Sequence, residues 1–434
     1  MKILVIGAGG REHAIVWALK KTAQRAVTIY CAPGNAGIAR MAKTVPIAIS
    51  DHAGLISFAK TEGIGLSFVG PEAPLVAGLV DEFESAGLSI VGPGALAARL
   101  EGSKVFAKDF MSRHKIPTAE YRTATSPEEA IEHLHNLEFG SPESSVVVKA
   151  DGLAAGKGVV VAKDHAEAES AITDLMVAHV AGREAATRII LEETLEGLEA
   201  SLLLFADGKN YVLMPAARDH KRIGEGDTGP NTGGMGSITD ASILTDKQMR
   251  RVVTEIVEPT LRGASDEGFP FKGVLFIGLM LTSSGPKVLE YNVRFGDPET
   301  QAILVRLKTD LLAIFDAIRQ GTLGELKVEW VDGASACVVA ANRGYPGKYE
   351  SGAVISGCDE VGINGVQVFH SGTSLSETGE LIARGGRVLG VTAASGSLAT
   401  ALDACYSALE IIHWSGMQFR RDIGKSKPAF GTVA

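Results

Sequence analysis

The sequence predicts a multidomain α/β protein that begins with a doubly wound parallel sheet and continues into a larger antiparallel part and a small C-terminal α+β domain. Its 434 residues exceed one ordinary core, because a domain usually contains about 100–200 residues. In the first hundred residues, short apolar runs alternate with helix-like segments, which is typical of a parallel sheet with helices on both faces. A second group of strand-like runs farther along the chain indicates a larger antiparallel sheet.

The N-terminal domain is expected over 1–102. Its strands are the apolar runs that end in Gly or Pro, at 3–6, 27–31, 66–69 and 88–91. Ligands of such sheets bind at the carboxyl ends of the strands. Gly7 and Gly9 start a dinucleotide-like turn, but the third glycine of that pattern falls on Glu12, and no acidic residue ends the second strand. An NAD site is therefore not expected, whereas a helix N-terminus at Gly9 and Gly10 that holds a phosphate and a tight turn without a ligand both stay open.

A separate lobe is expected over 121–190, following a helix that Ser103 caps and that runs to about residue 114. Pro127 opens a second helix in this lobe. The remaining elements are strands at 146–149 and 159–162, the glycine-rich loop between them, and a helix near 166–180.

The glycine-rich loop at 151–158 does not match a P-loop. Gly152 and Gly156 are one residue too close, Gly158 stands where the P-loop has Ser or Thr, and a β-branched strand follows instead of a helix. We interpret the loop as a hairpin whose backbone N–H groups close over phosphates, with Lys149 and Lys157 as the cations.

The larger sheet is expected to contain the runs at 189–191, 201–205, 274–281 and 287–291. Glu290 and Asn292 are two residues apart on the last run, so both side chains should point to the same face. Two hard oxygen ligands on one strand suit a Mg²⁺ ion that also binds substrate phosphates. Arg294 continues this face, and Asp297 and Glu299 follow within a turn.

Two further polar segments are candidates for ligand contact. The charge run Asp219-His220-Lys221-Arg222 precedes a glycine-rich stretch at 227–236, which is expected to be a long loop, and such loops are usually functional or disordered. The charge run by itself is equally typical of a solvated surface. Glu192 and Glu193 end a strand, which makes them candidates for a hinge that meets an adenine.

Composition excludes several classes of protein. The formal net charge of −9 argues against a large nucleic-acid or anionic-membrane surface, because both need clustered Lys and Arg. The longest apolar stretch, at 274–281, is shorter than the about 20 residues of a membrane span. The four cysteines form no C-x-x-C pair, so neither a zinc site nor a disulfide framework is expected. We expect a cytoplasmic protein, a monomer or weak homodimer, with no nucleic-acid or membrane partner.

In these residues the chain resembles the glycinamide ribonucleotide synthetases, a family of phosphoribosylamine–glycine ligases in the ATP-grasp superfamily. The motifs that carry the resemblance occur in one order from Met1 to about Gly424: IGAGGREHA, APGNAG, VGPEAPLV, LEGSK, VKADGLAAGKGV, DHKR, DTGPNTGGMG, NVRFGDPETQ, GGRVLGVTA and RRDIG. The resemblance implies a two-lobed ATP-grasp fold between the N-terminal and C-terminal domains. Its main lobe would comprise 103–120 and 191–325, its lid 121–190, and the C-terminal domain 326–434.

The resemblance also implies an activity: ATP-dependent joining of glycine to 5-phosphoribosylamine, through a glycyl phosphate, in purine synthesis. ATP would be held by Lys104, Lys149, Gly156, Lys157, Gly158, Glu192, Glu193 and Glu199. Mg²⁺ or Mn²⁺ would be held by Glu290 and Asn292, and the catalytic residues would be Lys149, Lys157, Arg294 for the acyl phosphate and Asp219 for the glycine ammonium. Phosphoribosylamine would be held by Gly9, Gly10, Arg11, Glu12, Gly70, Pro71 and Glu72.

One departure from the superfamily pattern concerns the metal, since the run 276–282 offers no acidic ligand on the neighbouring strand. Three other functions stay open at this level. The first is another ATP-grasp enzyme, such as a carboxylase or an amino-acid ligase. The second is an NAD-dependent oxidoreductase on the N-terminal sheet, which Glu12 already disfavours, and the third is a nucleotide-binding module without activity.

Overall fold

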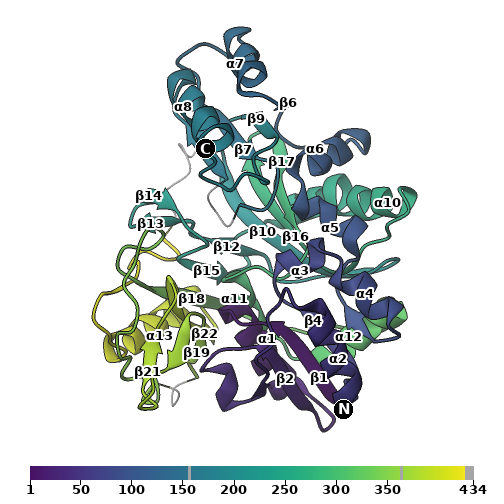
Figure 1. The fold of residues 1–434 in the computed structure, drawn as a ribbon, viewed down its shortest axis with the longest axis vertical. Helices are drawn as coiled ribbons and strands as arrows, with labels where there is room; N and C mark the ends of the chain where they lie inside the picture. Colours follow the sequence, from purple (N-terminus) through teal and green to yellow (C-terminus); the bar gives the residue numbers. More distant parts are fainter. Residues whose placement is uncertain (155–157, 362–364, 426–434) are drawn as a thin grey trace.

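The structure is a computed structural model that describes residues 1–154, 158–361 and 365–425. Figure 1 shows a lobe around α7 and α8 standing above a broad body, in which the N-terminal part and the C-terminal part lie side by side. A central sheet runs through the body and continues into the C-terminal part.

The N-terminal part is the predicted parallel sheet, in the order β3-β2-β1-β4-β5. Side chains of β1 alternate between two cores, with Ile3 and Val5 in one and Leu4 and Ile6 in the other, so both faces are covered. The strands are β1 (Lys2–Gly7), β2 (Thr28–Pro33), β3 (Lys43–Thr44), β4 (Leu66–Val69) and β5 (Ile90–Val91). The helices are α1 (Gly10–Thr22), η1 (Ile38–Arg40), α2 (His52–Glu62), α3 (Glu72–Val76), α4 (Leu79–Ser85) and α5 (Ala95–Gly102).

The upper lobe has its own four-stranded sheet, in the order β6-β9-β7-β8, and its own core. Its elements are β6 (Tyr121–Ala124), α7 (Pro127–His135), β7 (Val146–Ala150), β8 (Val159–Ala162), α8 (His165–Met176) and β9 (Ile189–Glu193). The antiparallel pairing of β7 with β8 confirms the predicted hairpin. The assignment of 189–191 to the larger sheet was wrong. This segment pairs with β6 and β7, because Ile189 and Leu191 bury their side chains in the core of the upper lobe.

The central sheet has ten strands, and its main path is β17-β16-β10-β12-β15-β18-β22-β19. Pairing of β15 with β18 makes the C-terminal strands a continuation of the same sheet. The strands are β10 (Leu198–Asp207), β11 (Tyr211–Leu213), β12 (Ala217–Asp219), β15 (Gly236–Thr239), β16 (Lys272–Thr282), β17 (Gly285–Asn292), β18 (Ala334–Asn342), β19 (Gln367–His370), β22 (Arg387–Ser395) and β23 (Met417–Gln418).

Helices flank this sheet and anchor the other parts to it. They are α6 (Lys104–Arg113), α9 (Asp246–Val252), a π-helical turn (Val253–Val257), α10 (Glu258–Asp266), α11 (Glu299–Leu304), α12 (Leu311–Gln320), η3 (Leu323–Glu325) and α13 (Leu398–Ile411). The N-cap of α6 is Ser103, whose hydroxyl accepts a hydrogen bond from the N–H of Phe106, as predicted. A small ribbon of β20 (Thr373–Leu375) and β21 (Leu381–Ala383) completes the C-terminal part.

The segment after the charge run is a hairpin rather than the expected long loop. Strands β13 (Arg222–Gly224) and β14 (Thr228–Asn231) pair antiparallel. One tertiary contact that holds them is Arg420, which is 1% exposed and donates to the carboxylate of Asp227 and to the carbonyl of Arg222. The sequence could not reveal this contact, because Arg420 is almost two hundred residues away along the chain.

Candidate active site

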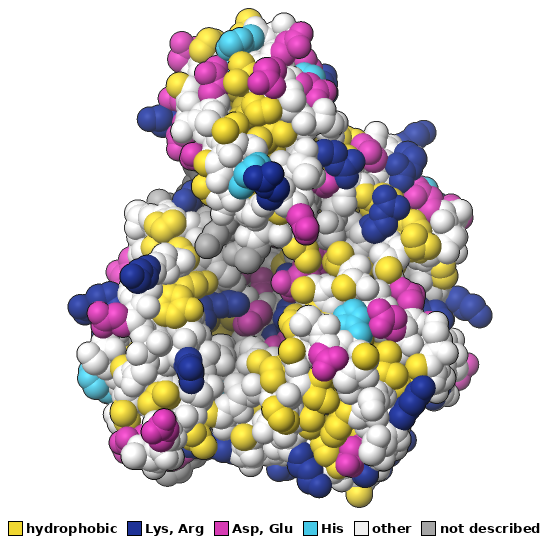
Figure 2. All heavy atoms as spheres, viewed as in Figure 1, with side chains coloured by type: hydrophobic (Ala, Val, Ile, Leu, Met, Phe, Trp, Pro, Cys, Tyr) yellow, Lys and Arg dark blue, Asp and Glu magenta, His cyan; other side chains and the backbone are white. Residues whose placement is uncertain are grey.

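A cleft separates the upper lobe from the body. Figure 2 shows the surface hollowed there, with acidic and basic side chains gathered inside. The polar side chains that line the cleft come from α3, α5, α6, β7, β9, β17 and the residues just after β17. They are Glu72, Glu101, Lys104, Lys108, Lys149, Glu192, Glu290, Asn292 and Arg294.

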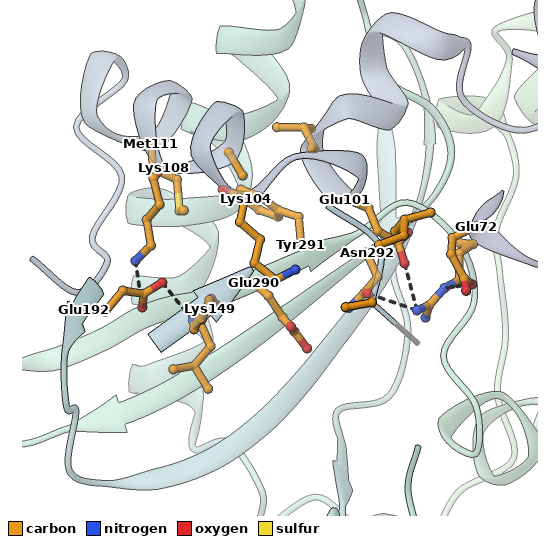
Figure 3. Close-up of a pocket in the computed structure, with 16 residues that line it drawn as sticks. Glu72, Glu101, Lys104, Lys108, Met111, Lys149, Glu192, Glu290, Tyr291 and Asn292 are labelled. Atoms are coloured by element: carbon orange, nitrogen blue, oxygen red, sulfur yellow. Dashed lines mark hydrogen bonds and ion pairs between the residues drawn. The ribbon is translucent and has the colours of Figure 1, made fainter. Parts of the chain in front are cut away.

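Glu192 lies at one end of the cleft between two lysines (Figure 3). Its Oε2 atom is 3.1 Å from Lys108 Nζ, and its Oε1 atom is 2.9 Å from Lys149 Nζ. All three residues are buried. Burial lowers the pKa of Lys108 to about 8, although Glu192 opposes this shift. Sequence reasoning missed Lys108; its position one helical turn after Lys104, on the same face of α6, was the available signal.

The start of α6 is tied to the first residues of the glycine-rich loop. Asp151 accepts hydrogen bonds from the Ser103 hydroxyl and the Val105 N–H, and Lys104 Nζ donates to the carbonyl of Gly152 at 3.3 Å. Gly158 accepts a hydrogen bond from the N–H of Ala150 at 2.7 Å. Gly156 and Lys157 lie outside the described residues. Lys104 and Lys149 therefore reach the same cleft from different lobes.

Glu290 and Asn292 both face the cleft, as their two-residue spacing predicted. The Glu290 carboxylate has no hydrogen-bond or ion-pair partner among the described residues, and Figure 3 shows it directed into the cavity. Burial opposes its ionisation, but Lys221, Lys149 and other nearby cations hold the pKa of Glu290 below its usual range. An unpaired carboxylate surrounded by cations is poised for a ligand that carries both metal and phosphate.

The residues present fit a divalent ion. Glu290 offers a free carboxylate, and the Asn292 Oδ1 atom, which accepts a hydrogen bond from Arg294 at 3.0 Å, retains a second lone pair. Within the described ranges, no cluster of three or more His, Cys, Asp or Glu side chains could hold a metal by itself. Such an ion would therefore complete its shell with phosphate oxygens and water, as Mg²⁺ usually does.

Arg294 connects this strand to the N-terminal part. Its guanidinium lies 2.8 Å from the buried carboxylate of Glu101 and 3.2 Å from that of Glu72. Burial raises the pKa of Glu101 even though Arg294 opposes this shift. Sequence reasoning missed Glu101, which also accepts the N–H of Val293 at 2.7 Å and so fixes the chain just after Asn292.

The turn residues predicted to bind phosphoribosylamine come together at the carboxyl ends of β1 and β4 in the N-terminal sheet. The Glu12 carboxylate accepts hydrogen bonds from the Gly9 N–H and from the Arg11 guanidinium, which also donates to the carbonyl of Phe295 at 3.0 Å. Gly70 packs directly on Glu12, and a side chain there would collide with the carboxylate. Pro71 precedes Glu72, which links this edge to Arg294.

The remaining predicted residues lie at the margins of the cleft. Burial raises the pKa of Asp219 to about 6, with Lys221 opposing and the carboxylates of Glu199 and Glu290 adding to the shift. Glu199 pairs with Lys221 at 2.8 Å. Glu193 pairs with Lys287 at 2.7 Å and does not belong to the cleft lining. Of the three glutamates expected at adenosine, the structure brings only Glu192 into the cleft wall.

A hairpin lobe whose Lys149 faces a carboxylate-bearing strand across a cleft is the arrangement of an ATP-grasp enzyme. The biotin carboxylase of Campylobacter jejuni shares this fold, with a TM-score of 0.70 at 16% identity over 97% of this chain and 93% of that one. Models of the phosphoribosylglycinamide synthetase N domain, ATP-grasp (A) domain and C domain match residues 1–101, 102–300 and 335–426. The chain belongs to the phosphoribosylglycinamide synthetase family.

Individual relatives agree with this assignment. The phosphoribosylamine–glycine ligase of Yersinia pestis is 48% identical over 98% of this chain and 98% of its own length. The crystal structure of the phosphoribosylamine–glycine ligase of Thermotoga maritima superposes with a TM-score of 0.82 at 33% identity, over 97% of this chain and all of that one. Among the described residues, no helix has the length and apolarity to cross a bilayer.

Proposed function

We propose that this chain joins glycine to 5-phosphoribosylamine with conversion of ATP to ADP and phosphate, and that glycyl phosphate is the intermediate. Membership of the family makes the chain an ATP-dependent ligase of purine biosynthesis. The observation that carries the proposal is the free carboxylate of Glu290, which lies among Lys104, Lys149, Lys221 and Arg294. Such a site can gather a metal-bound triphosphate and an acid next to it.

The chemistry follows from the poor reactivity of a carboxylate. An oxygen of glycine attacks the γ-phosphorus of ATP, ADP leaves, and the oxygen becomes part of a phosphate leaving group. The amine of phosphoribosylamine then attacks the glycyl carbon, an amide bond forms, and inorganic phosphate departs with that oxygen. Because the amine is already a nucleophile, positioning and charge neutralisation suffice for both steps.

Roles for individual residues follow from their chemistry and from the family resemblance. Lys104, Lys149, Lys157 and the glycines Gly156 and Gly158 would hold the phosphates, and Glu192, Glu193 and Glu199 the adenosine. Glu290 and Asn292 would hold Mg²⁺ or Mn²⁺, which when bound neutralises phosphate charge. Arg294 would face the acyl phosphate and Asp219 the ammonium of glycine. The turns Gly9, Gly10, Arg11, Glu12 and Gly70, Pro71, Glu72 would hold phosphoribosylamine.

The same proposal divides the chain into working parts. The lid at 121–190 would close on the main lobe, formed by 103–120 and 191–325, with 1–102 presenting the amine substrate and 326–434 supporting the sheet. Lid closure would keep water from the acyl phosphate. The substrates are ATP, glycine and 5-phosphoribosylamine. The chain acts in the cytoplasm, whose reducing conditions keep cysteines unpaired, as the four cysteines of this chain are. We propose that the chain acts as a monomer or weak homodimer.

A phosphate-release assay tests the proposal. Freshly made phosphoribosylamine, glycine and ATP are supplied together and then with each omitted in turn. Release should require all three, and release that does not depend on glycine would refute glycine as the acid substrate. Lys157→Ala should lower turnover if this lysine stabilises the transferring phosphoryl group, and an unchanged rate would remove that role. A nucleotide-binding module would bind ATP and release no phosphate with any combination.

A further inference from the structure

Three segments that are far apart in the sequence meet at the start of α1. Gly10 begins this helix, Gln301 lies in α11, and Ser371 follows β19 in the C-terminal part. A Cβ atom built on Gly10 would lie 2.5 Å from Ser371 Oγ and 2.7 Å from Gln301 Nε2. On the other side of Gln301 is Gly390 of β22, whose Cβ would lie 3.9 Å from the same amide nitrogen. Only glycine fits at position 10, because the Ser371 hydroxyl and the Gln301 amide pack directly against its backbone.

The amide of Gln301 is incompletely paired. Gln301 is 1% exposed, and its Nε2 atom donates to Asp297 Oδ1 at 2.7 Å. Its Oε1 atom is buried and accepts no hydrogen bond from any described residue. Buried polar atoms are nearly always paired in folded proteins. Gln301 Oε1 is therefore available to a ligand that supplies a donor.

The C-terminal part also fixes the carboxylate beside this amide. Arg387 of β22 donates to the backbone carbonyl of Asp297 at 2.7 Å and to its carboxylate at 3.2 Å. The same guanidinium donates to the carbonyl of Gly233 at 2.5 Å. Asp297 Oδ2 lies 3.5 Å from a Cβ built on Gly9. Arg387 therefore holds the Asp297 carboxylate against the turn that begins α1.

We call the site formed by Gly10, Asp297, Gln301 and Ser371 the corner. Its hydrogen-bonding groups match a sugar better than a phosphate. The acceptors are the Asp297 carboxylate, Gln301 Oε1 and the Ser371 hydroxyl, which makes no hydrogen bond to a described residue. The donors are the N–H groups of Gly10 and Arg11, which belong to the first turn of α1 and have no acceptor among the described residues. A hydroxyl group both donates and accepts. A phosphate dianion would face the Asp297 and Glu12 carboxylates, and like charges repel.

We propose that Gln301 and Ser371 hold the ribose hydroxyls of phosphoribosylamine, with Arg387 as a positioning residue that fixes Asp297. This inference rests on the proposed function and identifies which end of the amine substrate enters the corner. It also gives the C-terminal part a direct share in substrate recognition, because Ser371 and Arg387 both belong to it. The amine substrate would lie across the junction of all three parts of the body.

The test is binding of the reaction product, glycinamide ribonucleotide, to the full chain by calorimetry. Gln301→Met and Ser371→Ala should each weaken binding roughly three- to tenfold, the loss expected for one hydrogen bond. Ser374→Ala is the matched control, because Ser374 Oγ is also buried without a partner but lies in β20, away from Gly10. It should bind like the wild type.

Deoxy ligands separate recognition from structural damage. The 2′-deoxy and 3′-deoxy products should bind the wild type more weakly, and for one of them Gln301→Met should add no further loss. Equal weakening of all three ligands, or no weakening of any, would overturn the role of Gln301. If the wild type neither binds the product nor releases phosphate with glycine, the proposed function fails; if it does both and the variants match it, only this inference fails.

The positioning role of Arg387 is tested by a kinetic constant that a purely structural role would not change selectively, the KM for phosphoribosylamine. Arg387→Met should raise the KM for phosphoribosylamine severalfold while kcat and the KM for ATP stay near wild type. Arg384→Met, on an exposed arginine three residues earlier, should change neither constant. A parallel change of kcat and both KM values would show general damage and overturn the positioning role.

Discussion

Replacing Lys108 by Met tests how the cleft holds its buried charges. Glu192 is 2% exposed and has a lysine on each side, at 3.1 and 2.9 Å. Lys108 also donates to the hydroxyl of Thr118 at 2.8 Å, so its position is fixed. Without Lys108, Glu192 has only Lys149 as a cation, and Lys149 is drawn away from the nucleotide.

The size of the effect follows from the interaction removed. A hydrogen bond to a charged group contributes about 1.5–3 kcal/mol, and each 1.4 kcal/mol is about tenfold in affinity. Lys108→Met should therefore weaken ATP binding roughly tenfold to hundredfold. Stability should suffer less, because the deletion leaves a neutral pair of one carboxylate and one ammonium rather than an unpaired buried charge.

The pH dependence gives the prediction its sharpest form. Burial lowers the pKa of Lys108 to about 8, so the wild type has the charged pair below this pH and loses it above. The ratio of wild-type to variant kcat/KM for ATP should be largest near pH 6.5 and shrink towards one near pH 9.5, since kcat/KM reports the free enzyme. The folded state binds fewer protons than the unfolded state between about 8 and 10.5. The free energy of unfolding of the wild type should therefore rise with pH relative to the variant.

The assay is glycine-dependent phosphate release over this pH range, with ATP varied and the other substrates saturating. Lys247→Met, on an exposed lysine of α9, controls for loss of surface charge and should follow the wild type. A ratio that is the same at pH 6.5 and pH 9.5 would refute the reasoning, because the charge of Lys108 would then have no part in ATP binding.

Three further outcomes are expected. Glu290→Gln should retain the fold, as judged by circular dichroism, but lower phosphate release by about 100-fold or more, the usual loss when one electrostatic contact to a transition state is removed; turnover near wild type would exclude Glu290 from the site. Arg294→Met leaves the buried Glu101 carboxylate without its cation and should lower the free energy of unfolding, measured in urea, by about 3–5 kcal/mol, whereas Arg294→Lys should recover part of this. Arg420→Met should speed hydrogen exchange of the hairpin amides around Asp227, and protection equal to wild type would show that other contacts hold the hairpin.

Local patterns were sufficient for much of the fold and site. The parallel strands of the first hundred residues, the cap at Ser103 and the hairpin around the glycine loop depend on residues close together in sequence, and all three were predicted. The common orientation of Glu290 and Asn292 follows from the two-residue period of a strand. Lys104 entered the prediction through its motif, whereas Lys108 was missed, although it lies one helical turn later on the same face of α6.

Long-range pairing decided the rest. The apolar pattern of the segment 189–191 fits a buried strand of either sheet. The segment joins the upper lobe because Ile189 and Leu191 pack in the core of that lobe. The hairpin after the charge run contacts Arg420, and the Asp297 carboxylate pairs with Arg387. Both arginines lie in motifs of the C-terminal part, and the sequence does not show which distant residues they meet.

The sequence by itself thus determined the local features of this protein: lysines beside a glycine hairpin, the oxygen-bearing side chains of Glu290 and Asn292 on one face of a strand, and an α/β frame that carries them. Tertiary structure alone decided which charges face one another in the cleft and which of them stay unpaired. The physical reason is that a side chain's burial and electrostatic neighbours depend on how distant elements pack, whereas periodicity and capping depend on the residues beside it.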